Sequence, residues 1–221
     1  MDYYNQKTRI TASAIGVLLG IAGLLNHGLF EILQGNTPTN GIFIEAIGEA
    51  NRFWVHGTEA AVTVIPNFLV TGICAVLVSL AIILWSIKYI QTKHGATVFL
   101  SLSILLALVG GGIGYIILLL PTWAYATRMH KPLDWWRNIL PARLRKGLSR
   151  LWVYGLTLTF ISWLIVMELG IFGFFPGQTN PDTILNIVFT FLFSTVILEN
   201  FTFVCGFARD IEERESGLSS Q

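Results

Sequence analysis

Five long apolar runs limit most strongly what this chain can fold into. They lie at residues 10–33, 60–87, 97–126, 151–175 and 183–206. An α-helix needs about 20 residues to cross about 30 Å of hydrocarbon, and every run reaches that length. Only 12% of the residues are charged, roughly half of the ~25% that is usual in soluble domains. The sequence therefore predicts an all-α, polytopic integral membrane helix bundle, with four full transmembrane helices and a third hydrophobic segment that is broken by glycine.

That third segment, residues 97–126, allows two topologies because Gly110–Gly114 interrupt it. In one topology the segment enters and returns at the glycines, which places thirteen of the fourteen Lys and Arg residues on one side and only Arg52 on the other. In the other, it is a fifth crossing. The positive-inside rule favours the re-entrant topology, whereas the rarity of broken backbone at membrane depth favours the crossing. Both give a multi-pass plasma membrane protein with a cytoplasmic C-terminus, in which one transmembrane domain (1–208) precedes a charged tail (209–221).

The first apolar run carries a stripe of small and polar residues on one helical face. Gly16, Gly20, Gly23, His27 and Glu31 follow one another at intervals of four, three, four and four. Small residues let membrane helices approach closely. We therefore expect this face to contact other helices and to carry the imidazole and the carboxylate inward.

A second periodic pattern lies between the first two runs. Its polar residues recur at intervals of four, three, four, three and four, which places them on one face of a helix of 3.6 residues per turn. They are Glu45, Glu49, Arg52, His56, Glu59 and Thr63. The pattern predicts a helix over this stretch, and the direction of its polar face stays open.

Ionisable side chains inside membrane segments are costly and often functional. In this chain they are His27, Glu31, Glu168 and Glu199, together with His56 and Glu59 at the mouth of the second run. In the re-entrant topology all except Glu199 lie near the outer face.

One hypothesis for this cluster is a divalent-metal site formed by His27, Glu31, His56 and Glu59. Imidazole and carboxylate ligands suit several transition metals, and residues three or four apart share a helical face. The alternative is a structural network in which His27 bonds Glu31 and His56 bonds Glu59. Haem between the two histidines fits less well, since one histidine faces inward and the other lies at the mouth. The cofactor is therefore not fixed by the sequence.

A second hypothesis is a proton or ion pathway. Glu168 and Glu199 would lie at different depths, and carboxylates at staggered depths are typical of transporters and proton relays.

A third hypothesis is a non-enzymatic membrane module that binds lipid or a partner protein, either another membrane protein or a second copy of this chain. Residues 128–150 form a basic segment with tryptophans, which is typical of a lipid interface. Its candidate lipid contacts are Trp135, Trp136, Arg137, Arg143, Arg145 and Lys146. The net charge of +1 gives no indication of a nucleic-acid partner. Nucleophile, phosphate-loop and Cys-x-x-Cys motifs are lacking, so a non-enzymatic role is favoured over catalysis.

Overall fold

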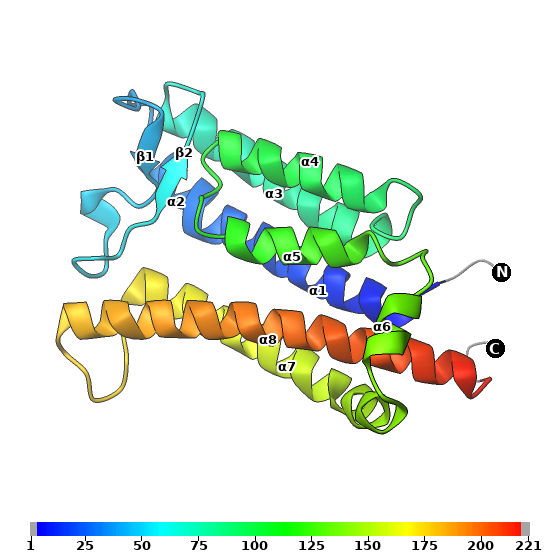
Figure 1. The fold of residues 1–221 in the computed structure, drawn as a ribbon. Coiled ribbons are helices and arrows are strands. Elements are labelled where there is room, and N and C mark those ends of the chain that lie inside the picture. The colour runs from blue at the N-terminus through cyan, green and yellow to red at the C-terminus, as the bar shows by residue number, and fades with distance from the viewer. Residues whose placement is uncertain (1–3, 218–221) are drawn as a thin grey trace.

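The structure, a computed structural model, describes residues 4–217 as a bundle of helices with a small two-stranded sheet at one end (Figure 1). The α-helices are α1 (Gln6–Ala22), α2 (Leu29–Leu33), α3 (Phe68–Lys88), α4 (Gly95–Leu108), α5 (Ile116–Ala126), α6 (Asp134–Ile139), α7 (Ala142–Phe172) and α8 (Pro181–Glu215). The strands are β1 (Phe43–Glu45) and β2 (Ala60–Val62), which pair antiparallel. Both described chain ends lie at the end of the bundle opposite the strands. We call these two ends the terminal end and the sheet end.

Four helical stretches are long and apolar enough to cross a membrane, judged by length and composition. They are Gln6–Leu33, Phe68–Lys88, Ala142–Phe172 and Pro181–Glu215. The predicted helical bundle with four helices of transmembrane length and composition is confirmed.

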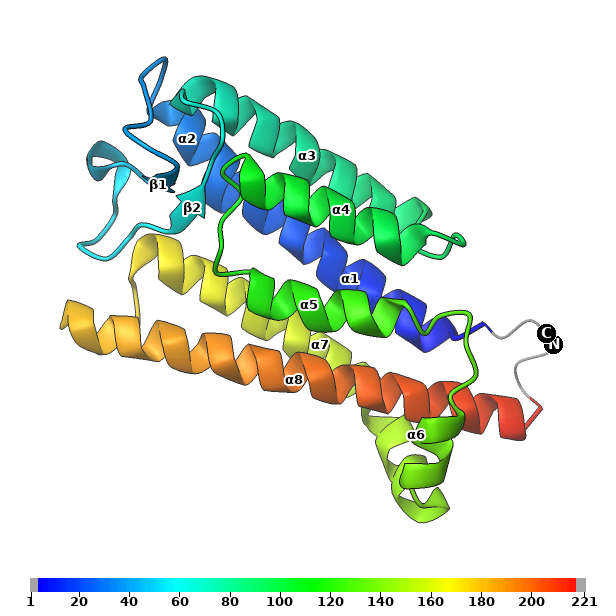
Figure 2. The same ribbon diagram turned by 45° about the horizontal axis from the view of Figure 1, so that its top comes forward.

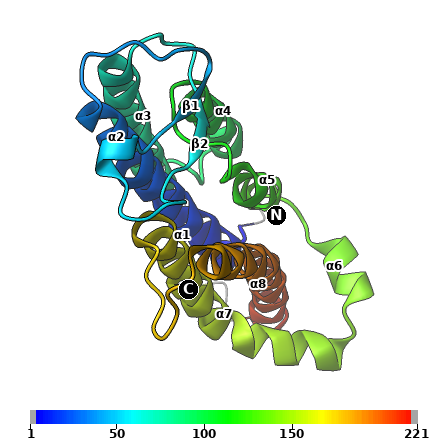
Figure 3. The ribbon, with the colours of Figure 1, turned by 90° about the vertical axis from the view of Figure 1, so that its left-hand side faces the viewer.

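Helix α1 lies in the middle of the bundle and contacts α3, α5, α7 and α8, as the end-on view shows (Figure 3). Its apolar face, including Ile15 and Leu18, joins a continuous core that also contains Phe99, Trp163 and Phe203. The glycine stripe faces α3, because a Cβ at Gly20 would meet Ile83 and Ser79 of that helix. The prediction that small residues bring helices together here is confirmed.

Residues 97–126 fold into two antiparallel helices, α4 and α5, joined by a turn at the sheet end (Figure 2). The turn's backbone bonds to β2 and the residues after it: Gly110 N donates to Val62 O at 2.9 Å, and Val64 N donates to Leu108 O at 2.9 Å. These hydrogen bonds pair backbone N–H and C=O groups at the end of α4 and in the turn, which have no partner within a helix.

The predicted helix over Glu45–Thr63 is wrong. This stretch consists of β1, a short 3₁₀ turn (Glu49–Asn51), an irregular loop and β2. Gly48 has extended backbone angles, and β2 gains partners in both β1 and the α4–α5 turn. Pairing with distant segments therefore outweighs a local helical pattern.

Several element boundaries also differ from the predicted ones. Helix α3 begins at Phe68, not residue 60, because Asn67 caps it by accepting a hydrogen bond from Val70 N at 3.1 Å. Helix α7 begins at Ala142, inside the predicted interfacial segment. Helix α8 continues to Glu215, so residues 209–215 of the predicted tail are helical; residues 218–221 of that tail lie outside the described residues.

Candidate functional site: a buried imidazole–carboxylate centre

The first span changes from α- to π-helix between Gly23 and Gly28, and this segment carries Asn26 and His27. Both side chains are fully buried. A π-helical turn inside an α-helix is rare and frequently marks a functional site. Here the π-helical turn begins and ends at a glycine. A Cβ at Gly28 would collide with Val76 of α3. Close packing of the backbone on that side leaves Asn26 and His27 directed to the interior.

Four side chains from three parts of the chain form a hydrogen-bonded network, which we call the Glu59 centre. His27 Nε2 lies 2.8 Å from Glu59 Oε2. The Tyr115 hydroxyl donates to Glu59 Oε1 at 3.1 Å, and Asn26 Nδ2 lies 3.3 Å from the same oxygen. Asn26 Nδ2 also donates to the Tyr115 hydroxyl at 3.0 Å. The first span, the loop before β2 and the residue before α5 thus meet at one carboxylate.

Aromatic packing and a glycine turn fix the position of this centre. The rings of Tyr115 and Trp163 stack at 5.4 Å, and the ring of His27 meets Tyr115 edge-on at 5.6 Å. Gly112 has φ +85°, and a Cβ there would overlap the His27 imidazole. The turn between α4 and α5 therefore needs glycine at this position to lie against the ring.

The environment of Glu59 favours its ionised form. Burial acts to raise the pKa of this carboxyl, but His27 and the hydrogen bonds from His27, Asn26 and Tyr115 together hold the pKa below its ordinary value. About a quarter of the Glu59 side chain stays accessible. The carboxylate is consequently charged near neutral pH and can be reached from outside the protein.

Glu31 lies four residues beyond His27 and is fully buried. Within residues 4–217 neither of its carboxyl oxygens has a hydrogen-bond partner. A Cβ at Gly110 (φ +99°) would overlap this carboxyl group, so the α4–α5 turn covers Glu31 as it covers His27. A buried carboxylate without donors costs several kcal/mol, so a proton or a cation is needed to compensate its charge.

A cavity of about 290 Å³ opens beside Glu59, between the loop before β2 and helices α7 and α8. Its polar side is formed by His56, Thr58, Glu59 and Tyr115, and its apolar side includes Val166, Leu185, Val188, Phe189 and Leu192. His27 and Asn26 are not among its lining residues. Glu59 therefore joins the buried network to the cavity.

The remaining residues predicted for the outer cluster lie apart from the centre. His56 Nε2 contacts Asp182 Oδ1 at 2.8 Å, and its ring meets Trp54 edge-on. Glu168 is exposed on α7. The expected pairs His27–Glu31 and His56–Glu59 are wrong, because the loop places Glu59 at His27 and leaves His56 beside α8.

Glu199 is fully buried in α8 and forms a separate polar contact nearer the terminal end. Its Oε1 accepts a hydrogen bond of 2.6 Å from the Thr122 hydroxyl of α5. The adjacent Asn200 accepts a hydrogen bond from Tyr125 at 2.8 Å. These contacts hold α5 against α8.

The predicted metal ligands do not gather at one point: across residues 4–217, no group of three or more His, Cys, Asp or Glu side chains could hold a metal ion. His27 and Glu59 are the pair of the predicted set that the structure joins by a hydrogen bond.

The predicted lipid-facing residues divide into two groups. Arg145 is buried and binds Glu212 and Glu215 at 2.6 Å, and Arg137 binds Glu215 at 2.8 Å. Trp135, Arg143 and Lys146 are exposed, and Trp136 is half-buried. The second group and Arg137, whose side chain is 58% exposed despite its ion pair, have surface available to a lipid, whereas Arg145 does not.

Sequence reasoning did not identify Asn26, Tyr115 or Trp163. Asn26 directly precedes His27 and Tyr115 directly follows the glycine-rich turn, so both adjoin features that the sequence had singled out. Comparison of the chain with protein-family models, with curated proteins and with solved structures gives no match.

Proposed function

We propose that this chain is a multi-pass plasma membrane protein that transports protons, which bind and exchange at the Glu59 centre near the outer face of the membrane. The observation that carries this proposal is the position of Glu59. It contacts the buried His27 at 2.8 Å and also lines an open cavity. A carboxylate that touches both a buried imidazole and an accessible space has the geometry of a proton-exchange group.

The orientation within the membrane follows from charge. Thirteen of the fourteen Lys and Arg residues belong to segments at or near the terminal end, and only Arg52 belongs to the sheet end. The positive-inside rule then makes the terminal end cytoplasmic. Helices α4 and α5 contain 14 and 11 residues, about 21 and 16 Å at 1.5 Å per residue, which suits a re-entrant pair better than two full crossings.

The chemistry of exchange needs a carboxylate that can accept a proton and an imidazole that can share it. Tyr115 and Asn26 stabilise negative charge on Glu59 Oε1, so Oε2 is the oxygen that faces His27. A proton arriving from the cavity can move between Glu59 Oε2 and His27 Nε2 without rearrangement of either side chain. Glu31 is the next carboxyl group after His27 in the first span. Because its oxygens have no hydrogen-bond partner among residues 4–217, we propose Glu31 as the second proton or cation site.

A flux measurement tests this proposal. Purified protein is reconstituted in vesicles that contain a trapped pH-sensitive dye, and a potassium gradient with valinomycin imposes a membrane potential. We expect proton flux in the wild type and at least a tenfold lower rate in Glu59→Gln, which keeps the size of the side chain and removes its charge. Glu168→Gln is the matched control, since Glu168 is exposed on α7. Equal rates for wild type and Glu59→Gln, or no rate above protein-free vesicles, would contradict the proposal.

The shape of the cavity supports a second candidate, the binding of an amphipathic molecule. One side is polar and the other is formed by aliphatic and aromatic side chains of α7 and α8, as in many small-molecule sites. Quenching of Trp54 fluorescence by lipids with brominated chains tests this, with Trp54→Phe supplying the background. We expect quenching that falls when Leu185→Phe narrows the cavity without adding a tryptophan; unchanged quenching would contradict occupancy of this space.

A further inference from the structure

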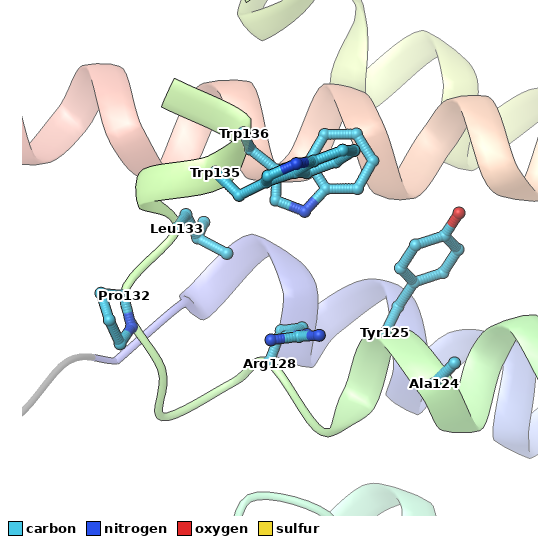
Figure 4. Close-up of a pocket in the computed structure, with 7 residues that line it drawn as sticks. All are labelled: Ala124, Tyr125, Arg128, Pro132, Leu133, Trp135 and Trp136. Atoms are coloured by element: carbon cyan, nitrogen blue, oxygen red, sulfur yellow. The ribbon is translucent and has the colours of Figure 1, made fainter. Parts of the chain in front are cut away.

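A second cavity lies at the terminal end, far from the Glu59 centre, and has a volume of about 420 Å³. Helix α5 and the following loop supply Ala124, Tyr125, Arg128, Pro132 and Leu133, and α6 supplies Trp135 and Trp136. Figure 4 shows Tyr125 and Arg128 on one side of this space and the two tryptophans on the other. The cavity therefore combines one cation with an otherwise mainly apolar and aromatic lining.

The walls of this cavity are held in place by contacts that do not involve its interior. Trp136 packs on Phe207 at 5.0 Å between ring centroids, and Tyr125 packs on Phe203 at 4.7 Å. The loop that carries Arg128 is fixed by Asn5, whose Nδ2 donates to Arg128 O at 2.6 Å and to Lys131 O at 3.0 Å. A cavity with fixed walls binds a ligand at a lower cost in conformational entropy.

Arg128 is the cation at this cavity that is free to bind a ligand. Within residues 4–217 its guanidinium has no ion pair and no hydrogen bond, and it is exposed. Two other arginines at this end are neutralised, since Arg145 and Arg137 bind acids of α8. No acidic residue lines the cavity.

We propose that this cavity binds the headgroup of an anionic phospholipid, with Arg128 on the phosphate and Trp135 and Trp136 beside the glycerol and the upper acyl chain. Guanidinium binds phosphate through paired hydrogen bonds, and tryptophan is enriched at headgroup depth. The apolar lining favours a lipid over free phosphate, because inorganic phosphate would leave these surfaces uncovered. The excess of basic residues at this end favours an anionic lipid over a zwitterionic one.

Native mass spectrometry of the intact detergent-solubilised chain tests this site by counting bound lipids during titration with phosphatidylglycerol. We expect about tenfold weaker binding for Arg128→Gln. Arg150→Gln is the matched control, because Arg150 is an exposed arginine of the same basic segment outside the cavity, and this variant should bind as the wild type does. Ala124→Phe, which fills the cavity and keeps the charge, should also weaken binding.

Three results would overturn the proposal. Equal weakening by Arg128→Gln and Arg150→Gln would indicate general attraction to a basic surface. Equal affinity for phosphatidylcholine would remove the dependence on an anionic lipid. Displacement of phosphatidylglycerol by an equal concentration of inorganic phosphate would make free phosphate the ligand.

Discussion

Substitution of Gly112 by alanine tests whether the α4–α5 turn holds His27 against Glu59. Gly112 has φ +85°, which costs an L-residue about 1–2 kcal/mol. The new Cβ would also overlap the His27 ring. If the ring moves away, the contact with Glu59 is lost, and hydrogen bonds to charged groups contribute about 1.5–3 kcal/mol. We therefore expect Gly112→Ala to lower the free energy of unfolding by about 2.5–5 kcal/mol.

Thermal unfolding in detergent measures this loss, and a chain of this length should lose roughly 10 °C in its midpoint. Two other glycines serve as controls that distinguish the cost of backbone strain from the cost of overlap with the His27 ring. Gly35 has φ +76° and open space around it, so Gly35→Ala should cost only the 1–2 kcal/mol of strain. Gly114 has open space and no positive φ, so Gly114→Ala should change stability by less than about 0.5 kcal/mol.

A double substitution sharpens the result. Because His27→Ala removes the ring that the new Cβ would meet, Gly112→Ala should cost less in that background, with a coupling energy of about 1–3 kcal/mol. If Gly112→Ala is no more destabilising than Gly35→Ala, or if the two effects simply add, the turn does not position His27.

Three further changes follow from the same contacts. The pKa of Glu59 lies below its ordinary value of 4.5. The stability that ionised Glu59 contributes is therefore complete above pH 4.5 and is lost as the pH falls through the lowered pKa. Acid unfolding should show this loss in the wild type and not in Glu59→Gln. Thr122→Val removes the donor to Glu199 and should lower the free energy of unfolding by about 1–3 kcal/mol, whereas a change below 0.5 kcal/mol in denaturant titration would exclude a structural role for this bond. Asp210 accepts hydrogen bonds from the backbone N–H of Thr8 and the preceding residue at the start of α1, so Asp210→Ala should cost about 1–2 kcal/mol in the same titration, and an unchanged midpoint would contradict this capping role.

The local sequence was sufficient to predict the apolar helices. It was insufficient to predict the conformation of the loop that brings Glu59 to the centre. The apolar runs and the glycine spacing of the first span depend on helical geometry alone, and they placed His27 inside the bundle. The stretch from Glu45 to Thr63 was assigned to a helix because its polar spacing is regular. Its conformation depends instead on hydrogen bonds to the α4–α5 turn, more than forty residues away, and such pairing leaves no periodic signal in the loop.

The candidate site was partly predictable for the same reason. His27 and Glu59 were both recognised as costly ionisable groups, yet each was assigned to a sequence neighbour, Glu31 or His56. Contacts between residues close in sequence can be inferred from helical spacing, whereas the contact between His27 and Glu59 requires the path of the intervening loop. Tyr115 was missed because a single tyrosine within an apolar run is ordinary in membrane proteins.

Infrared difference spectroscopy of the Glu59 carboxyl group tests whether this residue is an ionised group that exchanges protons with solvent. Spectra of the reconstituted protein are compared between neutral and acidic pH in H₂O and D₂O, and Glu59→Gln identifies the bands that belong to this residue. We expect Glu59 to be ionised at neutral pH, to take up a proton only at a pH below the ordinary pKa of glutamate, and to exchange with solvent promptly through the cavity. A Glu59 that is protonated at neutral pH, or that does not exchange with D₂O, would contradict proton exchange at this centre.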